Sequence, residues 1–188
     1  MAARDGMTNL IAELRGLTAA GTADYSLGTA SYWTDDHLQN ALDRFRKDVH
    51  RENLTPVYSY NGGSVECKEY RSRFENLESG TAAFDIELST GTNAGTADYS
   101  VDYTRGVVTF SADQGGTAWY LNARSYDLNA SAAYVWRQKA AHVSSYYDVS
   151  TDGHSLKRSQ MTKHFNDMAI YYEGMTSPES VELYRSDM

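Results

Sequence analysis

The sequence predicts an α+β protein: a small helical bundle of about four helices, an inserted antiparallel β-meander and an extended C-terminal arm. Three observations lead to this prediction. Apolar residues recur at steps of three and four near both ends of the chain, which is typical of amphipathic helices. Between residues 57 and 126 they alternate with polar residues, which is typical of half-buried strands. Residues 175–188 are polar and carry too little apolar surface for a core of their own.

The composition indicates one folded domain of ordinary size. The chain has 188 residues, of which 41% are hydrophobic and 22% charged. A chain of this length can bury a sufficient core without disulfides or structural metals. It contains no apolar run long enough to span a membrane and no basic start leading into a signal core, so we expect neither membrane insertion nor secretion. The net charge is −8, and the sequence has no basic patch of the kind that binds the phosphates of nucleic acids.

The first part, residues 1–54, is predicted to be helical. In residues 8–15 the apolar side chains share one helical face, with Thr8 as a cap and Gly16 as a stop. A longer helix is predicted over Thr34–Arg51, where Thr34 can cap the first turn and two acids follow it. Its apolar positions are Leu38, Ala41, Leu42, Phe45 and Val49.

The second part, residues 55–126, is predicted to be the β insertion. Asn61-Gly62-Gly63 is a hairpin turn signal between two runs of strand character. Further strands are predicted where apolar residues alternate with polar ones, around Phe84–Leu88, Tyr99–Tyr103, Val107–Phe110 and Ala118–Leu121. The lone Cys67 lies in one of these strands, so we expect a reduced, structural thiol.

The third part, residues 127–174, is predicted to be an antiparallel helix pair. One helix carries Ala132, Val135, Trp136, Ala140, Val143 and Tyr147 on a single face. A polar turn at Asp148–Gly153 leads into the last helix, which Gly174 ends. The face of that helix is marked by Met161, Phe165, Met168 and Tyr172.

The sequence predicts no catalytic, cofactor-binding or metal-binding residues. The five histidines show no metal-ligand spacing, and no serine elbow or phosphate-binding glycine loop is present. With 25 acidic residues, neighbouring carboxylates are expected by chance. The local positive feature is Lys157, Arg158 and Lys163 near the start of the last helix, where cations are mildly unfavourable. These three residues are either a subunit or partner contact or a solvated helix face.

The aromatic composition favours surfaces that are apolar on one side and wet or partnered on the other. Fifteen Tyr and three Trp stand against five Phe, so most large side chains carry a polar group. A tyrosine-rich sheet is the simpler explanation. Exposed aromatic faces such as Trp119-Tyr120 would instead suit a glycan-binding module.

The order of several segments resembles the head-to-tail adaptor, or connector, proteins of tailed bacteriophages. Each segment is weakly specific, and their order carries the resemblance across most of the chain. The segments are Trp33-Thr34-Asp35-Asp36-His37-Leu38 with Leu42-Asp43, Asp102–Phe110, Trp136-Arg137-Gln138-Lys139-Ala140-Ala141, and Ser155–Met161. The large β insertion departs from the plain pattern of that family.

The resemblance implies a non-enzymatic virion protein of the head-tail neck, assembled in the host cytoplasm and without cofactors. It implies a ring, typically of twelve copies, that docks beneath the portal, receives a stopper or tail-completion protein, and lets DNA pass transiently. The portal-docking arm would carry Pro178, Val181, Leu183, Tyr184 and Arg185. The alternatives are a tail-side completion protein, a glycan-binding module and, least favoured, a glycosidase using a carboxylate pair.

Overall fold

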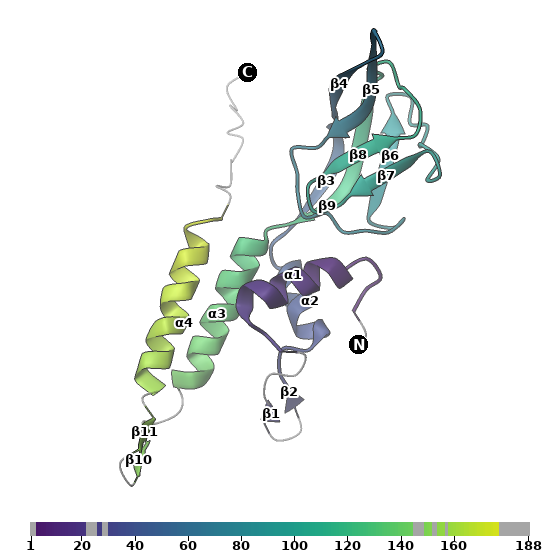
Figure 1. Cartoon of the computed structure of the whole chain (residues 1–188). Helices are drawn as coiled ribbons and strands as arrows, with labels where there is room; N and C mark the ends of the chain where they lie inside the picture. Colours follow the sequence, from purple (N-terminus) through teal and green to yellow (C-terminus); the bar gives the residue numbers. More distant parts are fainter. Residues whose placement is uncertain are drawn as a thin grey trace, which may run out of the picture.

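The protein is a mixed α+β structure, which confirms the predicted class. The computed structural model describes residues 3–21, 26–27, 30–144, 149–151, 154–156 and 158–176. Within these ranges the helices lie at one end and most strands at the other (Figure 1). The helices are α1 (Thr8–Thr18), α2 (Asp35–Asp43), α3 (Leu128–Ser144) and α4 (Arg158–Glu173). The strands are β1 (Ser26–Leu27), β2 (Ala30–Ser31), β3 (Arg46–Asn53), β4 (Thr55–Asn61), β5 (Ser64–Arg71), β6 (Phe84–Leu88), β7 (Tyr99–Asp102), β8 (Val107–Phe110), β9 (Trp119–Tyr126), β10 (Val149–Thr151) and β11 (His154–Leu156).

The helices α1, α2 and α3 enclose the first of two hydrophobic cores. The apolar residues that the helical period places on one face are buried here, because each helix turns that face toward the others. The core consists of Met7, Leu10, Ile11, Leu14, Ala20, Trp33, Leu38, Ala41, Leu42, Tyr126, Leu128, Ala132 and Val135. The side chain of Asp127 starts α3 by accepting the N–H of Ala130 at 2.9 Å.

The second core lies in the β unit, residues 46–126, between two antiparallel sheets. Their strand orders are β3-β9-β6 and β4-β5-β8-β7. The predicted runs around 84–88, 99–103 and 107–110 form β6, β7 and β8, so these strands are confirmed. Within the sheets only β4–β5 and β7–β8 pair strands that are adjacent in sequence, so the arrangement is not a simple meander. The core residues are Val49, Leu54, Cys67, Tyr70, Leu77, Phe84, Ile86, Val108, Phe110, Trp119, Leu121 and Ala123.

The helix predicted over Thr34–Arg51 is wrong in its second half. The helix ends at Asp43, and β3 begins at Arg46, so the β region starts before residue 55. Val49 fits the helical spacing, but it is buried in the sheet core, with Ala123 of β9 as its register partner. Thr34 holds the N-cap position, yet its hydroxyl lies 2.9 Å from His37 Nδ1 and makes no capping hydrogen bond.

The stop predicted at Gly16 is also wrong, because α1 continues to Thr18. The helix ends at Ala19, which takes a left-handed conformation with φ of 47°. The buried ammonium of Lys139 donates to the carbonyl oxygens of Thr18 at 2.9 Å and Ala19 at 3.2 Å. A cation thus satisfies carbonyls at the negative end of the helix dipole. Thr8 does not cap the other end, since Met7 is the N-cap residue and its side chain makes no capping hydrogen bond.

The helices α3 and α4 form the predicted antiparallel pair (Figure 1). Asn129 at the start of α3 donates to the carbonyl oxygen of Met175, just past the end of α4, at 3.1 Å. Further along, the ring centroid of Trp136 lies 5.4 Å from that of Phe165. The last helix ends at Glu173, directly before Gly174, as predicted.

The connection between these helices differs from the predicted polar turn at Asp148–Gly153. Val149–Thr151 form β10, which pairs with His154–Leu156 of β11. Asp148, Asp152 and Gly153 lie outside the described residues.

The β unit is attached to the helices through two neighbouring strands. The chain enters it along β3, directly after α2, and leaves it along β9, directly before α3 (Figure 1). These strands pair antiparallel, and Arg46 and Tyr126 are register partners at their base. Entry and exit are therefore adjacent.

The β4–β5 hairpin forms around the predicted Asn61-Gly62-Gly63 turn. Gly62 and Gly63 have φ of 58° and 94°, which is why glycines suit this turn. Tyr60 and Val65 face each other across the hairpin as register partners. Cys67 on β5 is a free, buried thiol, in agreement with the structural role expected for it.

Candidate interaction surfaces

A partly buried polar network joins the helical part to the β unit. Arg4, just before α1, forms a bidentate pair with Asp43 at the end of α2, with both N–O distances 2.7 Å. The same guanidinium reaches the Oη of Tyr126 on β9 at 3.0 Å. That hydroxyl donates to the carboxylate of Glu78 at 2.5 Å, and Glu78 is 2% exposed. Arg124 adds a second cation 3.6 Å from Glu78.

The electrostatics of this network follow from its contacts. The hydrogen bonds from Arg4 lower the pKa of Asp43 and outweigh its partial burial. Burial, followed by the bond to Glu78, raises the pKa of the Tyr126 hydroxyl. The carboxylate of Glu78 is surrounded by one hydroxyl donor and two guanidinium groups, so its buried charge is compensated. The network therefore supports a fixed connection between the two parts.

A backbone contact beside the network strengthens that connection. The N–H of Ser79 donates to the carbonyl oxygen of Gly6 at 3.3 Å, and so does the Ser79 hydroxyl at 3.2 Å. Gly6 has φ of +93°, and a Cβ added there would lie 1.8 Å from the carbonyl oxygen of Ser79. Only glycine fits this approach.

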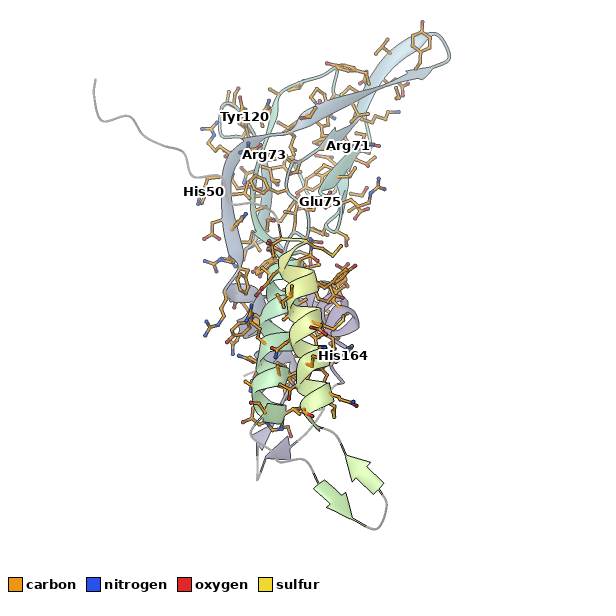
Figure 2. All side chains as sticks on the ribbon, turned by 90° about the vertical axis from the view of Figure 1, so that its left-hand side faces the viewer. His50, Arg71, Arg73, Glu75, Tyr120 and His164 are labelled. Atoms are coloured by element: carbon orange, nitrogen blue, oxygen red, sulfur yellow. The ribbon has the colours of Figure 1, made fainter. Side chains whose placement is uncertain are left out.

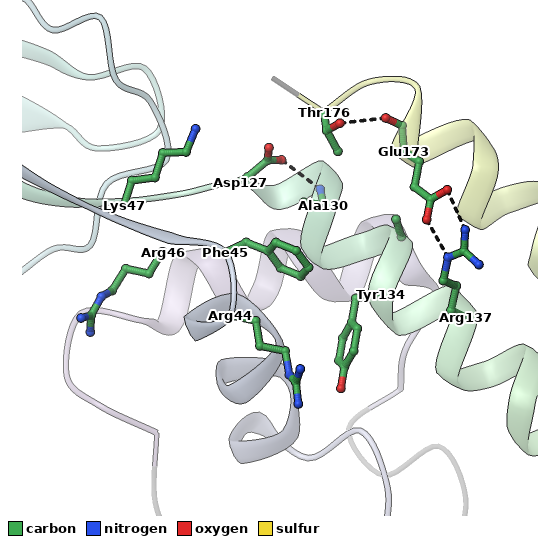
Figure 3. Close-up of a pocket in the computed structure, with 11 residues that line it drawn as sticks. Arg44, Phe45, Arg46, Lys47, Asp127, Ala130, Tyr134, Arg137, Glu173 and Thr176 are labelled. Atoms are coloured by element: carbon green, nitrogen blue, oxygen red, sulfur yellow. Dashed lines mark hydrogen bonds and ion pairs between the residues drawn. The ribbon is translucent and has the colours of Figure 1, made fainter. Parts of the chain in front are cut away.

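An open groove of about 580 Å³ lies where α2, β3, α3 and α4 meet (Figure 3). We call it the cationic groove, because it has four cationic side chains and two carboxylates in a chain of net charge −8. Its lining consists of Arg44, Phe45, Arg46, Lys47, Asp127, Ala130, Ala133, Tyr134, Arg137, Glu173 and Thr176.

The charges of the cationic groove are only partly neutralised from within. Arg137 and Glu173 form a bidentate pair at 2.6 and 2.8 Å. Arg46 pairs with Asp48 at 3.0 Å. Lys47 makes no ion pair with any described residue, and the guanidinium of Arg44 lies over the ring of Tyr134, 4.7 Å from its centroid. Two cations thus remain for an outside anion.

Apolar side chains are exposed at two separate places. On the β4–β5 hairpin, Tyr58, Tyr60 and Val65 are 61%, 78% and 58% exposed. On and just after α4, large apolar groups also reach solvent: Met161, Ile170, Tyr171 and Met175. The hairpin projects from the end of the β unit opposite the helices (Figure 1). The two exposed sets are far apart on the molecule.

The residues predicted as a partner contact are only partly within the described chain. Lys163 is exposed on α4. Arg158 begins α4, but its side chain lies outside the description, as does Lys157. The predicted docking-arm residues also lie outside the described residues: Pro178, Val181, Leu183, Tyr184 and Arg185.

The aromatic pair suggested for sugar binding is not a flat exposed platform. Trp119 is 8% exposed and stacks on Phe110, with centroids 5.0 Å apart. The ring of Tyr120 is half-buried and has the guanidinium of Arg51 5.3 Å from its centroid. One face of Tyr120 is therefore already occupied by a cation.

Of the described histidines, His37 and His142 both lie beside the ring of Tyr32, at 5.7 and 6.1 Å between ring centroids. His50 lies on β3 and His164 on α4, in different parts of the molecule (Figure 2). Among the described residues no group of three or more His, Cys, Asp or Glu side chains could hold a metal ion. No helix in the described ranges is both long and apolar enough to cross a membrane.

Comparison with known proteins adds no assignment. No protein-family model matches this chain, and no curated protein matches it significantly.

Sequence reasoning missed both the polar network and the cationic groove. The members of the network lie far apart in sequence, so no local pattern indicates them. The groove did carry a local signal, because Arg44, Arg46 and Lys47 place three cations within four residues. These cations lie within the helix predicted over Thr34–Arg51, where they are expected on its solvent-exposed face.

Proposed function

We propose that this protein is a structural adaptor of the tailed-phage neck, forming a ring beneath the portal. The observation that carries the proposal is the order of the elements: α1, α2, the β unit, and the α3–α4 pair leading into the last residues. In this proposal the four helices are the bundle, the β unit is the insertion, and residues 175–188 are the arm. This is the order that the resemblance to adaptor proteins implies.

The exposed apolar groups support assembly into a ring. A ring of identical subunits needs two different, complementary surfaces on each copy. In this proposal the two surfaces would be the hairpin with Tyr58, Tyr60 and Val65 and the side of α4 with Ile170 and Tyr171, whose apolar groups are exposed. Clustered exposed apolar side chains favour protein contacts. The Arg4 network would keep these surfaces in a fixed relation.

The other expected partners stay part of the proposal. The portal would bind the arm through Val181, Leu183 and Tyr184, and a stopper or tail-completion protein would bind the opposite rim. Genome DNA would pass through the channel, and the net charge of −8 per copy disfavours tight binding of DNA if it lines that channel. Lys163 remains a candidate contact between copies or with a partner.

Mass photometry of the portal ring from the same phage, with and without this protein, tests the proposal. Twelve copies of a 21.0 kDa chain would add about 250 kDa. Deleting residues 177–188 should abolish the gain, and so should Leu183→Asp in the full chain. Ser186→Asp is the control for added charge and should retain it. If circular dichroism shows the unmodified protein to be folded and the mass of the portal ring still does not increase, the adaptor assignment is overturned and the tail-side or glycan-binding alternatives are favoured.

A further inference from the structure

We infer that the cationic groove binds the acidic last segment of the same chain, residues 177–188. The proposal concerns the free protein and does not depend on the adaptor function. It assigns an occupant to the cationic groove, and it makes that occupant competitive with any partner that takes the same segment.

The last segment begins at the edge of the cationic groove. Thr176, the last described residue, itself lines the cationic groove. Its hydroxyl donates to the carbonyl oxygen of Glu173 at 2.8 Å, and Asn129 holds the carbonyl oxygen of Met175. The chain is therefore fixed at the edge of the groove at the point where the last segment begins (Figure 3). A tethered segment starts at a high effective concentration, on the order of millimolar.

The last segment is acidic, whereas the cationic groove has an excess of cations. Residues 177–188 carry Glu179, Glu182 and Asp187 against one cation, Arg185. The cationic groove offers the guanidinium of Arg44 and the ammonium of Lys47, which have no ion pair within the described chain. The signs are complementary in a protein that is acidic overall.

The cationic groove also has an apolar lining. Phe45, Ala130, Ala133 and Tyr134 line the cationic groove. In the last segment Glu182 lies between the apolar residues Val181 and Leu183, and Tyr184 follows them. An extended chain with this alternation can turn apolar side chains toward the lining and carboxylates toward the cations at the rim.

The length of the last segment allows it to extend beyond the cationic groove. A second hollow of about 330 Å³ adjoins the cationic groove and shares Lys47 and Asp127 with it. It adds Arg73, which is paired with Glu52 at 2.7 Å, and the carboxylate of Glu75. A twelve-residue segment can extend over about 40 Å, at up to roughly 3.3 Å per residue, so it is long enough to follow both hollows.

Photocrosslinking of the full chain tests the inference. Benzoylphenylalanine replaces Tyr184, a 1:1 mixture of ¹⁴N- and ¹⁵N-labelled protein is irradiated, and the joined peptides are identified by mass spectrometry. We expect crosslinks to the peptides that contain residues 44–47 or 130–137, with both peptides carrying the same isotope. Crosslinks elsewhere would overturn the proposal. Mixed-isotope pairs would do so as well, because they would mean that a second copy supplies the segment.

Charge reversal supplies the matched control. Arg44→Glu with Lys47→Glu should reduce the crosslink yield by about fivefold or more, since two attractive contacts become repulsive. Lys68→Glu with Arg105→Glu makes the same change in net charge on the β unit and should leave the yield unchanged. Equal yields from both double variants, each folded by circular dichroism, would refute the charge argument. Failure here would leave the portal-binding test unaffected.

Discussion

Removing the Tyr126 hydroxyl should weaken the connection between the helices and the β unit. Tyr126→Phe keeps the buried ring but takes away the donor to Glu78 and the acceptor for Arg4. Arg4 retains its bidentate pair with Asp43, so the main loss is one hydrogen bond to a buried charge. Such a bond contributes about 1.5–3 kcal/mol to the free energy of unfolding.

Urea unfolding measures this loss. With an m-value of about 2 kcal/mol per molar urea, a loss of 2 kcal/mol lowers the midpoint by about 1 M. Far-UV circular dichroism, which is dominated by the helices, should be followed together with tryptophan fluorescence, to which Trp119 of the sheet core contributes beside Trp33 of the helical core. We expect the two transitions to coincide in the wild type and to separate in the variant if the network couples the two parts.

The matched control is Tyr60→Phe, which removes a hydroxyl from a side chain that is 78% exposed. Water already serves that hydroxyl, so the expected change is within about 0.5 kcal/mol. If Tyr126→Phe shifts the midpoint no more than Tyr60→Phe does, the network does not contribute as argued.

Three further predictions concern single positions. Gly6→Ala should lower Tm by several degrees, because the added Cβ would lie 1.8 Å from a carbonyl oxygen. Gly16→Ala, in a helix with open space around it, should instead stabilise the protein by about 0.5–1 kcal/mol. Equal effects of the two substitutions would contradict the close approach at Gly6. Lys139→Met should cost about 1–3 kcal/mol in urea unfolding, since two carbonyls at the end of α1 lose their donor; an unchanged midpoint would contradict that role. The folded pKa of Asp43 lies below its unfolded value of about 3.9, so its contribution is present above that pH and is lost as pH falls through the folded pKa. Asp43→Asn should therefore be less stable at pH 7 and lose less stability on acidification, measured by thermal melts from pH 7 to 2.5; parallel curves would exclude this linkage.

Local periodicity was sufficient to predict a helix or strand wherever that element buries one face. The helical faces around Leu10, Leu38 and Val135, the hairpin at Gly62 and the alternation around Ile86 all follow from spacing and turn chemistry. These features need only a few neighbouring residues to be defined. They are therefore readable from a single sequence.

The second half of the predicted helix over Thr34–Arg51 shows where local reading fails. The spacing from Leu38 to Val49 fits a helix, but residues 46–53 pair with residues 120–126, a partner that no local window contains. The register of β3 also shifts between Val49 and Glu52, and Arg51 has φ of 48°, so strict alternation is lost there. Long-range pairing overrode the helical pattern.

The interaction surfaces were harder to predict than the fold. Arg4, Asp43, Glu78 and Tyr126 come from four separate segments and meet only after folding. The cationic groove likewise needs α2, β3, α3 and α4 to be in place. The arm residues from Pro178 to Arg185 lie outside the described residues, so their role stays a prediction.

The adjacency of β3 and β9 bears on how such a chain can change its size. Because Arg46 and Tyr126 face each other at the base, the chain enters and leaves the β unit at one attachment point on the helical part. We expect the fold to tolerate a larger, smaller or unrelated domain inserted at this attachment point, provided that the strands β3 and β9 remain paired. The sequences of the helices and of the β unit can then diverge at different rates. The residues of the Arg4 network are the ones that both parts must keep compatible.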